Sequence, residues 1–206
     1  MDGVPAEILV RIDDQVSKIA QLISASRSLV VAVGEIGLDY YYFNPEQPWL
    51  NSLKQLVQQI GFKKQIQLAN EFKLPVIVHS RDKTEAAYRE ILAILTNNLQ
   101  SAKPFVLHCA SGPMDYVQQA IALGAYVGFD GNLTYKNAEA LNRLARSVPT
   151  DKILLETDAP FLPPTPHRGK LCESWMVTLT AEWMSTQLHV SATQTTLNAQ
   201  ACFDVQ

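Results

Sequence analysis

The sequence predicts an α/β fold in which a parallel β-sheet is either covered by helices on both faces or wound into a barrel. Short apolar runs rich in Val, Ile and Leu alternate with segments of helical periodicity, and polar residues follow each run. Continuous apolar runs of this length are typical of strands that are buried on both faces. Five strands are predicted, at residues 29–33, 75–78, 104–107, 126–129 and 153–155.

Amphipathic helices are predicted between and around these strands. The apolar-periodic stretch from Trp49 to Phe72 is expected to form two helical pieces, because Gly61 weakens the join. Pro113 and Gly124 bracket another helix, in keeping with the preference for proline at helix starts and glycine just past helix ends. The remaining helices are expected around residues 12–23, 87–95, 141–148, 175–188 and after Ser191, where Gln194 completes a capping-box pattern.

Composition sets limits on domain count, location and partners. The 206 residues are 47% hydrophobic and 18% charged, which is ordinary for a single globular domain over residues 1–206. A net charge of −3 disfavours a basic nucleic-acid-binding module, so phosphate binding requires a local cluster or a metal. The three cysteines lack CxxC spacing, which favours free thiols in a reducing compartment. Without a membrane-length apolar run or a leader, the protein is expected to be cytoplasmic and to have no membrane partner.

Four candidate metal ligands follow four of the predicted strands. Glu35 follows the first strand, His79 the second, His108 the third and Asp158 the fifth. Because the carboxyl ends of parallel strands share one rim, these side chains are expected to lie on the same rim. Imidazole and carboxylate groups offer N and O donors to a divalent ion such as Mg²⁺, Mn²⁺ or Zn²⁺. Asp130, after the fourth strand, is a fifth residue at this rim, and its carboxylate can support the ligands.

Other interpretations of these residues stay open. Either histidine can be a structural residue, Glu35 can form an ion pair with Arg81, and Asp158 can cap a turn. A Ser-His-Asp hydrolase is disfavoured because no G-x-S-x-G elbow occurs, and Ser111 has the wrong context. A dinucleotide site is disfavoured because no G-x-G-x-x-G opens a helix after a strand.

Five motifs in the sequence resemble the TatD family of metal-dependent hydrolases. They are GEIGLDYYY at 34–42, PVIVHSRD at 75–82, LHCASG at 107–112, LLETDAPFL at 154–162 and HRGK at 167–170. The resemblance implies a TIM-type barrel, a site for one or two metal ions, and phosphodiester hydrolysis, typically of DNA. It implies that Glu35 bridges the metal ions and that His79 and His108 are ligands. By the same resemblance, Asp158 binds metal and takes a proton from the attacking water.

The sequence also departs from the family pattern. Members of the family open with a strand that ends in an H-x-H pair, and this sequence contains no H-x-H. The resemblance begins at what would be the fourth strand, so about five of eight βα units are expected, in an incomplete, N-terminally shortened barrel. Such a chain is expected to be weakly active. The alternative is a catalytically inactive, truncated or partner-completed barrel fragment. An open edge at residues 29–33 predicts a homo-oligomer.

Supporting roles follow for residues around the candidate ligands. Arg168 and Lys170 are predicted to hold phosphate oxygens of DNA or another phosphodiester substrate, with His167 a further candidate. The alternative is that this loop is simply solvated. Asp39 and Arg81 are predicted to orient the metal ligands through hydrogen bonds.

Overall fold

The computed structural model describes residues 3–100 and 103–205. The chain divides into two compact units, Met1–Pro104 and Phe105–Gln206. Both units consist of parallel strands that alternate with helices. No helix within the described ranges is long and apolar enough to cross a membrane.

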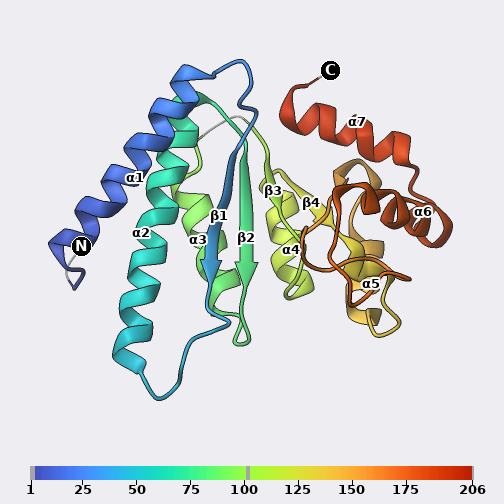
Figure 1. The fold of residues 1–206 in the computed structure, drawn as a ribbon, viewed down its shortest axis with the longest axis horizontal. Helices are drawn as coiled ribbons and strands as arrows, with labels where there is room; N and C mark the ends of the chain where they lie inside the picture. The colour runs from blue at the N-terminus through green and yellow to red at the C-terminus, as the bar shows by residue number, and fades with distance from the viewer. Residues whose placement is uncertain (1–2, 101–102, 206) are drawn as a thin grey trace. The chain divides into compact units, whose positions relative to one another are not determined.

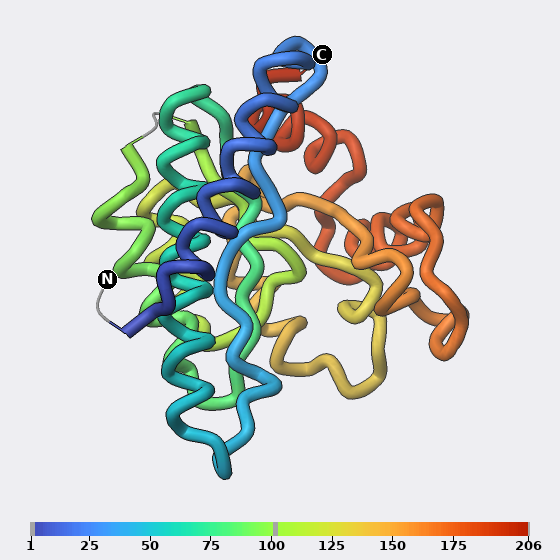
Figure 2. Tube along the Cα trace, turned by 60° about the vertical axis from the view of Figure 1, so that its left-hand side comes forward, coloured from blue at the N-terminus to red at the C-terminus, as the bar shows by residue number. Residues whose placement is uncertain are grey.

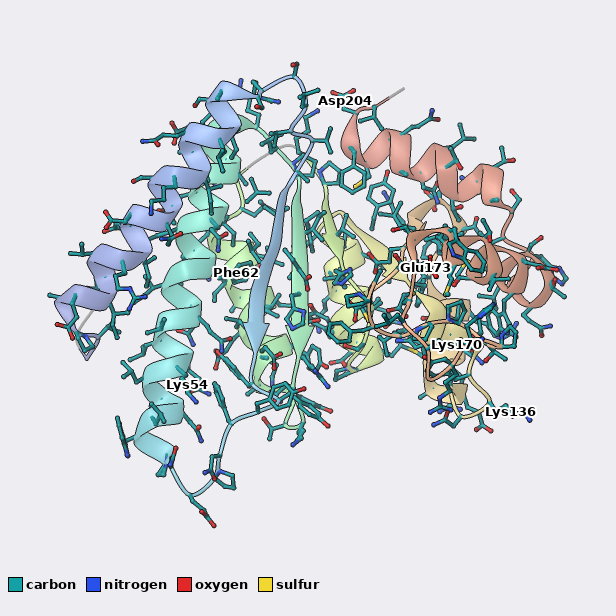
Figure 3. The ribbon with its side chains drawn as sticks, in the orientation of Figure 1. Lys54, Phe62, Lys136, Lys170, Glu173 and Asp204 are labelled. Carbon is teal, nitrogen blue, oxygen red and sulfur yellow. The ribbon has the colours of Figure 1, made fainter. Side chains whose placement is uncertain are left out.

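The first unit contains two strands and three helices. β1 and β2 pair in parallel, with Gly37 of β1 opposite His79 of β2. Helix α2 packs against β1, α3 packs against both strands, and α1 lies along α2, as Figure 1 and Figure 2 show. Phe62 of α2 is buried (Figure 3). The elements are α1 (Ala6–Ala25), β1 (Val33–Asp39), α2 (Pro48–Phe72), β2 (Val76–Arg81) and α3 (Ala86–Asn98).

The prediction of a strand at residues 29–33 is wrong in position. Residues 29–32 hold no helix or strand and Leu29 is 80% exposed, whereas β1 begins at Val33 and ends at Asp39. The glycines that suggested a strand end, Gly34 and Gly37, lie inside the strand, because residues of β2 approach them closely. A methyl group at Gly37 would collide with the carbonyl oxygen of His79, and the φ of Gly37 is +154°.

Oligomerisation is predicted from an open strand edge at residues 29–33, and the strand in question is β1. Among the described residues, no strand pairs with the outer side of β1. Oligomerisation through an open edge stays a prediction, now for Val33–Asp39.

The prediction of two helical pieces between Trp49 and Phe72 is also wrong, because α2 is one continuous helix of 25 residues. A glycine inside a helix costs only about 1 kcal/mol relative to alanine. That cost is offset by packing on both sides of Gly61. Phe62 and Ile66 are buried on one side, and Val57 faces α1 on the other.

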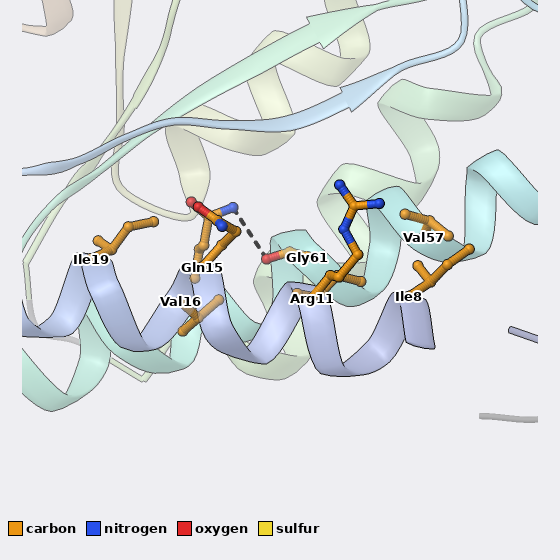
Figure 4. A pocket seen from close by; sticks show the side chains of 9 residues that line it. Ile8, Arg11, Gln15, Val16, Ile19, Val57 and Gly61 are labelled. Atoms are coloured by element: carbon orange, nitrogen blue, oxygen red, sulfur yellow. Dashed lines mark hydrogen bonds between the residues drawn. The ribbon is translucent and has the colours of Figure 1, made fainter. Parts of the chain in front are cut away.

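A groove of about 520 Å³ lies between α1 and α2 (Figure 4). Val57 and Gly61 line it from α2, and Gln65 of α2 donates a hydrogen bond to the carbonyl oxygen of Gly61 over 3.3 Å. Apolar side chains line it from α1, namely Ile8, Ile12, Val16 and Ile19. A methyl group at Gly61 would meet no atom within 4 Å, so the groove has room for a larger residue there.

The second unit is built on three parallel strands with β4 in the middle. All five residues of β4 are buried, as its continuous apolar sequence predicts. Helix α4 packs on β4, while α6 and α7 pack on β5. The elements are β3 (Phe105–Leu107), α4 (Met114–Ala122), β4 (Ala125–Phe129), α5 (Glu139–Ser147), β5 (Ile153–Leu155), α6 (Val177–Leu188) and α7 (Ala192–Phe203), with short 3-10 helices at Gly131–Thr134, Thr150–Lys152 and Ser174–Met176.

The predicted α/β class is confirmed, since five parallel strands alternate with helices. Among the described residues, neither the strands of the first unit nor those of the second close into a barrel. The last four predicted strands are confirmed to within three residues at their ends. The cap at Ser191 is confirmed as well, because its hydroxyl accepts a hydrogen bond from the backbone N–H of Gln194 over 3.1 Å.

Replacing Gly61 with alanine should stabilise the protein. Alanine restricts the unfolded chain and adds a methyl group where the groove has room, so the free energy of unfolding should rise by about 0.5–1 kcal/mol. Urea unfolding of the wild type and the Gly61→Ala variant measures this difference. Gly37→Ala is the matched control and should lower stability, because its methyl group has no room. Equal losses in the two variants would contradict the explanation.

Candidate functional site

In the first unit, His79 lies between two carboxylates. Its Nδ1 is 2.6 Å from Oε2 of Glu35, and its Nε2 is 3.4 Å from Oδ2 of Asp39. Glu35 and Asp39 both belong to β1, and His79 is the fourth residue of β2. Glu35 and His79 therefore lie within strands, and neither follows a strand end as predicted. The prediction that Asp39 orients a ligand has geometric support in this contact.

The backbone at the end of β1 fixes the position of Asp39. The side chain of Gln58 accepts a hydrogen bond from the backbone N–H of Asp39 over 2.7 Å, and its amide donates to the Asp39 carbonyl over 2.9 Å. One α2 side chain thus satisfies both backbone groups of Asp39. The carboxylate that faces His79 is therefore held by both β1 and α2.

The contact with Glu35 changes the protonation of His79. The hydrogen bond to Glu35 is the largest effect and raises the pKa of His79, burial opposes it, and the charge of Asp39 adds to the rise. In the metal-free protein, the proton is therefore held to higher pH than in an ordinary histidine. A divalent ion that binds His79 has to displace this proton, so ion binding should weaken as the pH falls.

In the second unit, His108 has a matching environment. It directly follows β3, as predicted, and its Nδ1 is 2.8 Å from Oε2 of Glu156. Its Nε2 is 3.5 Å from Oδ1 of Asp158. Glu156 also accepts a hydrogen bond from the backbone N–H of Cys109 over 2.5 Å. Glu156 therefore holds both the ring of His108 and the backbone that follows it.

A second group of potential donors lies beside Asp158. The thiol of Cys109 donates to Oδ2 of Asp130 over 2.9 Å, and one ligand atom each from Cys109, Asp130 and Asp158 lie within 4.8 Å of one another. Burial, with a smaller contribution from neighbouring carboxylates, raises the pKa of Asp130 to about 6. Burial and the adjacent Asp130 raise the pKa of the Cys109 thiol. At neutral pH in the absence of metal, Cys109 is therefore a protonated thiol that satisfies a buried carboxylate.

These donors fit a divalent ion. Two ligands of a tetrahedral ion at bond lengths near 2.0–2.1 Å stand about 3.4 Å apart. The separation between Nε2 of His108 and Oδ1 of Asp158 is 3.5 Å, and that between Nε2 of His79 and Oδ2 of Asp39 is 3.4 Å. When the shared proton is on Nδ1, Nε2 keeps its lone pair for a metal. A glutamate at Nδ1 with an aspartate at Nε2 is thus a usable half-site in each unit.

Other residues predicted to support the site make different contacts. The guanidinium of Arg81 lies 4.0 Å from the ring centre of Tyr41 and donates a hydrogen bond to the hydroxyl of Tyr42 over 3.2 Å. The guanidinium of Arg168 lies 4.5 Å from the ring centre of Tyr135. Both arginines therefore make cation–π contacts.

The rest of the predicted phosphate-binding loop belongs to the second unit. His167 packs edge-on against Trp175 with ring centres 5.6 Å apart. Lys170, labelled in Figure 3, is exposed, and its backbone N–H donates to the carbonyl oxygen of His167 over 3.0 Å. Arg168 and Lys170 thus stand on the surface of a turn, where they can meet an anion.

Sequence reasoning assigned no role to Glu156 or Cys109. Glu156 follows β5 directly and stands two residues before Asp158. Side chains two residues apart in an extended segment point to the same side, so this spacing could have identified Glu156 as a neighbour of the site. The position of Cys109 had no such signal, because its backbone turns to a φ of +46° immediately after β3.

Comparisons with known proteins place the chain beside metal-dependent hydrolases. A family model described as TatD related DNase matches residues 4–204. The uncharacterized metal-dependent hydrolase YcfH of Escherichia coli is 42% identical over 161 residues, which cover 78% of this chain and 56% of YcfH. The chain thus spans little more than half the length of that relative. The uncharacterized metal-dependent hydrolase YabD of Bacillus subtilis is 32% identical over 98% of this chain and 75% of its own length.

Further similarity extends to a named nuclease and to solved structures. The 3'-5' ssDNA/RNA exonuclease TatD of Erwinia amylovora is 33% identical over 87% of this chain and 68% of its own length. The crystal structure of YJJV, a TatD homologue from Escherichia coli, matches with a TM-score of 0.78 and 25% identity over 94% of this chain and 71% of its own. A TatD family hydrolase from Entamoeba histolytica shares the fold, with a TM-score of 0.72 and 20% identity over 91% of this chain and 68% of its own. These neighbours confirm the predicted TIM-type barrel fold, here with five of its βα units.

Removing the carboxylate at Nδ1 should lower the pKa of His79 in metal-free protein. The hydrogen bond to Glu35 favours the charged ring, so Glu35→Gln should shift the His79 titration to lower pH. Asp39→Asn should shift it less, because Asp39 makes a smaller contribution. NMR titration of the ring protons in EDTA measures both shifts.

The raised pKa of His79 also makes the stability of the metal-free protein depend on pH. Because the pKa of His79 is raised in the folded state, its pairing with Glu35 stabilises the metal-free protein fully below the unfolded pKa. That contribution is lost as the pH rises through the folded pKa. The stability difference between the wild type and Glu35→Gln should therefore shrink with rising pH in urea unfolding. A difference that grows with pH would contradict this assignment.

Proposed function

Because the chain belongs to the TatD related DNase family, we propose that it is a metal-dependent hydrolase that cleaves phosphodiester bonds in nucleic acid. The proposed metal ligands are Glu35, His79, His108 and Asp158. The observation that carries the proposal is the pair formed by Nε2 of His108 and Oδ1 of Asp158, 3.5 Å apart, with Glu156 bound to Nδ1 of the same ring. This is a ligand pair together with the carboxylate that orients it.

The donor set favours Mg²⁺, Mn²⁺ or Zn²⁺ as the ion. When bound, a divalent ion polarises a phosphoryl oxygen and lowers the pKa of a coordinated water. Side chains of the protein perform the other steps of the proposed reaction. Asp158 accepts the proton of the attacking water, while Glu156 keeps the ring of His108 in one orientation. Arg168 and Lys170 hold phosphate oxygens, because they supply positive charge in a chain whose net charge is −3, and His167 is a further candidate.

The number of ligands limits the expected activity. The four histidines of the sequence are His79, His108, His167 and His189, and no two of them form an H-x-H pair. The family pattern assigns an H-x-H pair to one of its two ions, so about one ion per chain is expected. We therefore expect weak ion binding and slow hydrolysis.

A catalytically inactive or partner-completed fragment is the second candidate. The missing H-x-H pair favours it, because that pair supplies ligands for one of the two ions in the family pattern. Two catalytic ions stabilise the attacking and leaving oxygens together, so losing one slows the reaction.

Substitution of the ligands separates metal binding from catalysis. His79→Ala and His108→Ala should abolish uptake of Mn²⁺ or Zn²⁺, measured by calorimetry and metal analysis. Asp158→Ala should lower the rate of bis(p-nitrophenyl) phosphate hydrolysis by about 100-fold or more, because it removes the proton acceptor. His189→Asn is the matched control. It changes a histidine at the end of α6, where the φ of +57° suits asparagine, and should alter neither property.

Two results would contradict the proposed ligand set. One is full metal uptake by both histidine variants. The other is uptake of two ions by the unmodified chain together with efficient DNA hydrolysis, because the chain would then need further ligands. Asp130, beside Asp158, would be the first residue to examine.

Removing the carboxylate at Nδ1 of His108 should weaken metal binding without unfolding the protein. Glu156→Gln keeps the shape of the side chain but loses the charge that orients the ring, so metal affinity should fall by about 10- to 100-fold. Titration with Zn²⁺ or Mn²⁺ measures the affinity, and thermal unfolding checks that the variant is folded. Unchanged affinity in a folded variant would show that Glu156 does not orient a ligand.

A further inference from the structure

The turn after β1 exposes two aromatic rings and buries a third. Tyr40 is buried, its hydroxyl donates to Oε2 of Glu90 over 2.5 Å, and its ring stacks on Phe43 at 4.8 Å. Tyr41 is half-buried, and Tyr42 is 71% exposed. The buried tyrosine therefore anchors the turn in the first unit and leaves Tyr42 at the surface.

Two cations from β2 and the residues after it stand against these rings. The guanidinium of Arg81 lies 4.0 Å from the ring centre of Tyr41 and 5.1 Å from that of Tyr42. Nζ of Lys83 lies 4.1 Å from the ring centre of Tyr41. The two rings meet edge-on at 5.0 Å. We call these four residues, Tyr41, Tyr42, Arg81 and Lys83, the aromatic–cation patch.

The backbone holds this patch in one conformation. The N–H of Tyr41 donates to Oδ1 of Asp39 over 2.9 Å, and the N–H of Tyr40 donates to the carbonyl oxygen of Arg81 over 2.9 Å. Gln58 binds both backbone groups of Asp39. A surface that is already ordered loses little conformational entropy when it binds a ligand.

We propose that the aromatic–cation patch binds single-stranded nucleic acid, with a base stacked on Tyr42 and the neighbouring phosphates held by Arg81 and Lys83. Exposed aromatic rings beside positive charges are the combination that binds unpaired strands without sequence preference. The proposal rests on the proposed function for the reaction that follows binding. It does not need that reaction in order to be tested.

Ring exposure and local charge favour an unpaired strand over other partners. A base can stack on Tyr42 only when its face is not already covered by neighbouring base pairs, as it is in a duplex. Arg81 covers at most one face of the Tyr42 ring, and the residue is 71% exposed, so area remains for a base. An acidic peptide would use the two cations but would gain nothing from the ring.

The anions nearby limit where a phosphate can approach. Glu35 and Asp39 face His79. The carboxylate of Asp82 accepts hydrogen bonds from the backbone N–H groups of Lys83 and Ala87. Phosphates therefore have their favourable contacts on the side of Arg81 and Lys83.

The first test is binding of a fluorescein-labelled oligothymidylate by the full chain, followed by fluorescence anisotropy in EDTA so that no hydrolysis occurs. Tyr42→Ala should weaken binding by about 5- to 150-fold, the range for losing one stacked base. Tyr42→Phe keeps the ring and should bind within about twofold of the wild type. Thermal unfolding of each variant separates a lost contact from a lost fold.

The second test is the salt dependence of binding. Arg81→Gln and Lys83→Gln should each reduce the slope of log K against log salt by about 0.7, the value for one phosphate contact of a single strand. Lys18→Gln is the matched control. It makes the same charge change on the exposed surface of α1 and should leave the slope unaltered.

Each possible outcome decides the proposal. It is overturned if the wild type fails to bind, if Tyr42→Ala binds as tightly as the wild type, or if the salt slope is unchanged by both charge substitutions. It is also overturned if a duplex of equal length binds as tightly, or if an oligoglutamate peptide displaces the strand at equal charge concentration. The proposed reaction fails separately: a wild type that binds through Tyr42 but shows no metal-dependent hydrolysis overturns only the hydrolase.

Discussion

One interaction occurs in each unit and positions the candidate metal ligands there, a carboxylate bound to Nδ1 of a histidine. Glu35 makes this contact with His79 at 2.6 Å, and Glu156 makes it with His108 at 2.8 Å. In each case an aspartate lies 3.4 or 3.5 Å from the opposite ring nitrogen. A ring held at one nitrogen cannot rotate without breaking a charge-assisted hydrogen bond, so the other nitrogen keeps a fixed direction. This constraint gives a defined ring orientation to His79, within β2, and to His108, directly after β3.

The strands were predictable where burial alone decides the sequence. Ile153–Leu155 and the buried residues of β4 form continuous apolar runs, and the structure places strands there. β1 obeys a different rule. Its glycines allow β2 to approach closely, through the side chain of Ile77 at Gly34 and the backbone of His79 at Gly37, so both glycines lie inside the strand although they resemble a turn in sequence. The periodicity of apolar residues in a sequence shows which side chains are buried. The close approach of two strands at a glycine leaves no apolar residue in the sequence to indicate it. The same limit explains Gly61, which a long, well-packed helix tolerates.

The residue types of the site were predictable, but their pairings were not. Histidines and carboxylates near strand ends predict metal chemistry, and the structure places two of the residues named from the sequence, His108 and Asp158, 3.5 Å apart. Which carboxylate meets which ring nitrogen depends on side-chain direction and on the φ of +46° at Cys109, which brings its thiol to Asp130. Arg81 shows the converse. Its sequence position near His79 suggested a role in orienting ligands, yet its guanidinium contacts the rings of Tyr41 and Tyr42 in the turn after β1.

The turn after β1 connects the proposed nucleic-acid patch with the environment of His79, a proposed metal ligand. Asp39 presents one carboxylate oxygen to the ring of His79 and the other to the backbone N–H of Tyr41. The side chain of Gln58 binds the backbone of Asp39. A displacement of this turn therefore moves the aromatic rings and the environment of His79 together. Substitutions inside the turn cannot be assigned to binding or to metal chemistry alone. The exposed side chain of Tyr42 is different. The hydrogen bond described for it is the one that its hydroxyl accepts from Arg81, and stacking of a base on the ring does not need this bond. Tyr42 can therefore separate the proposed binding of nucleic acid from the proposed metal chemistry, because its side chain makes no contact with Glu35, Asp39 or His79 among the described contacts.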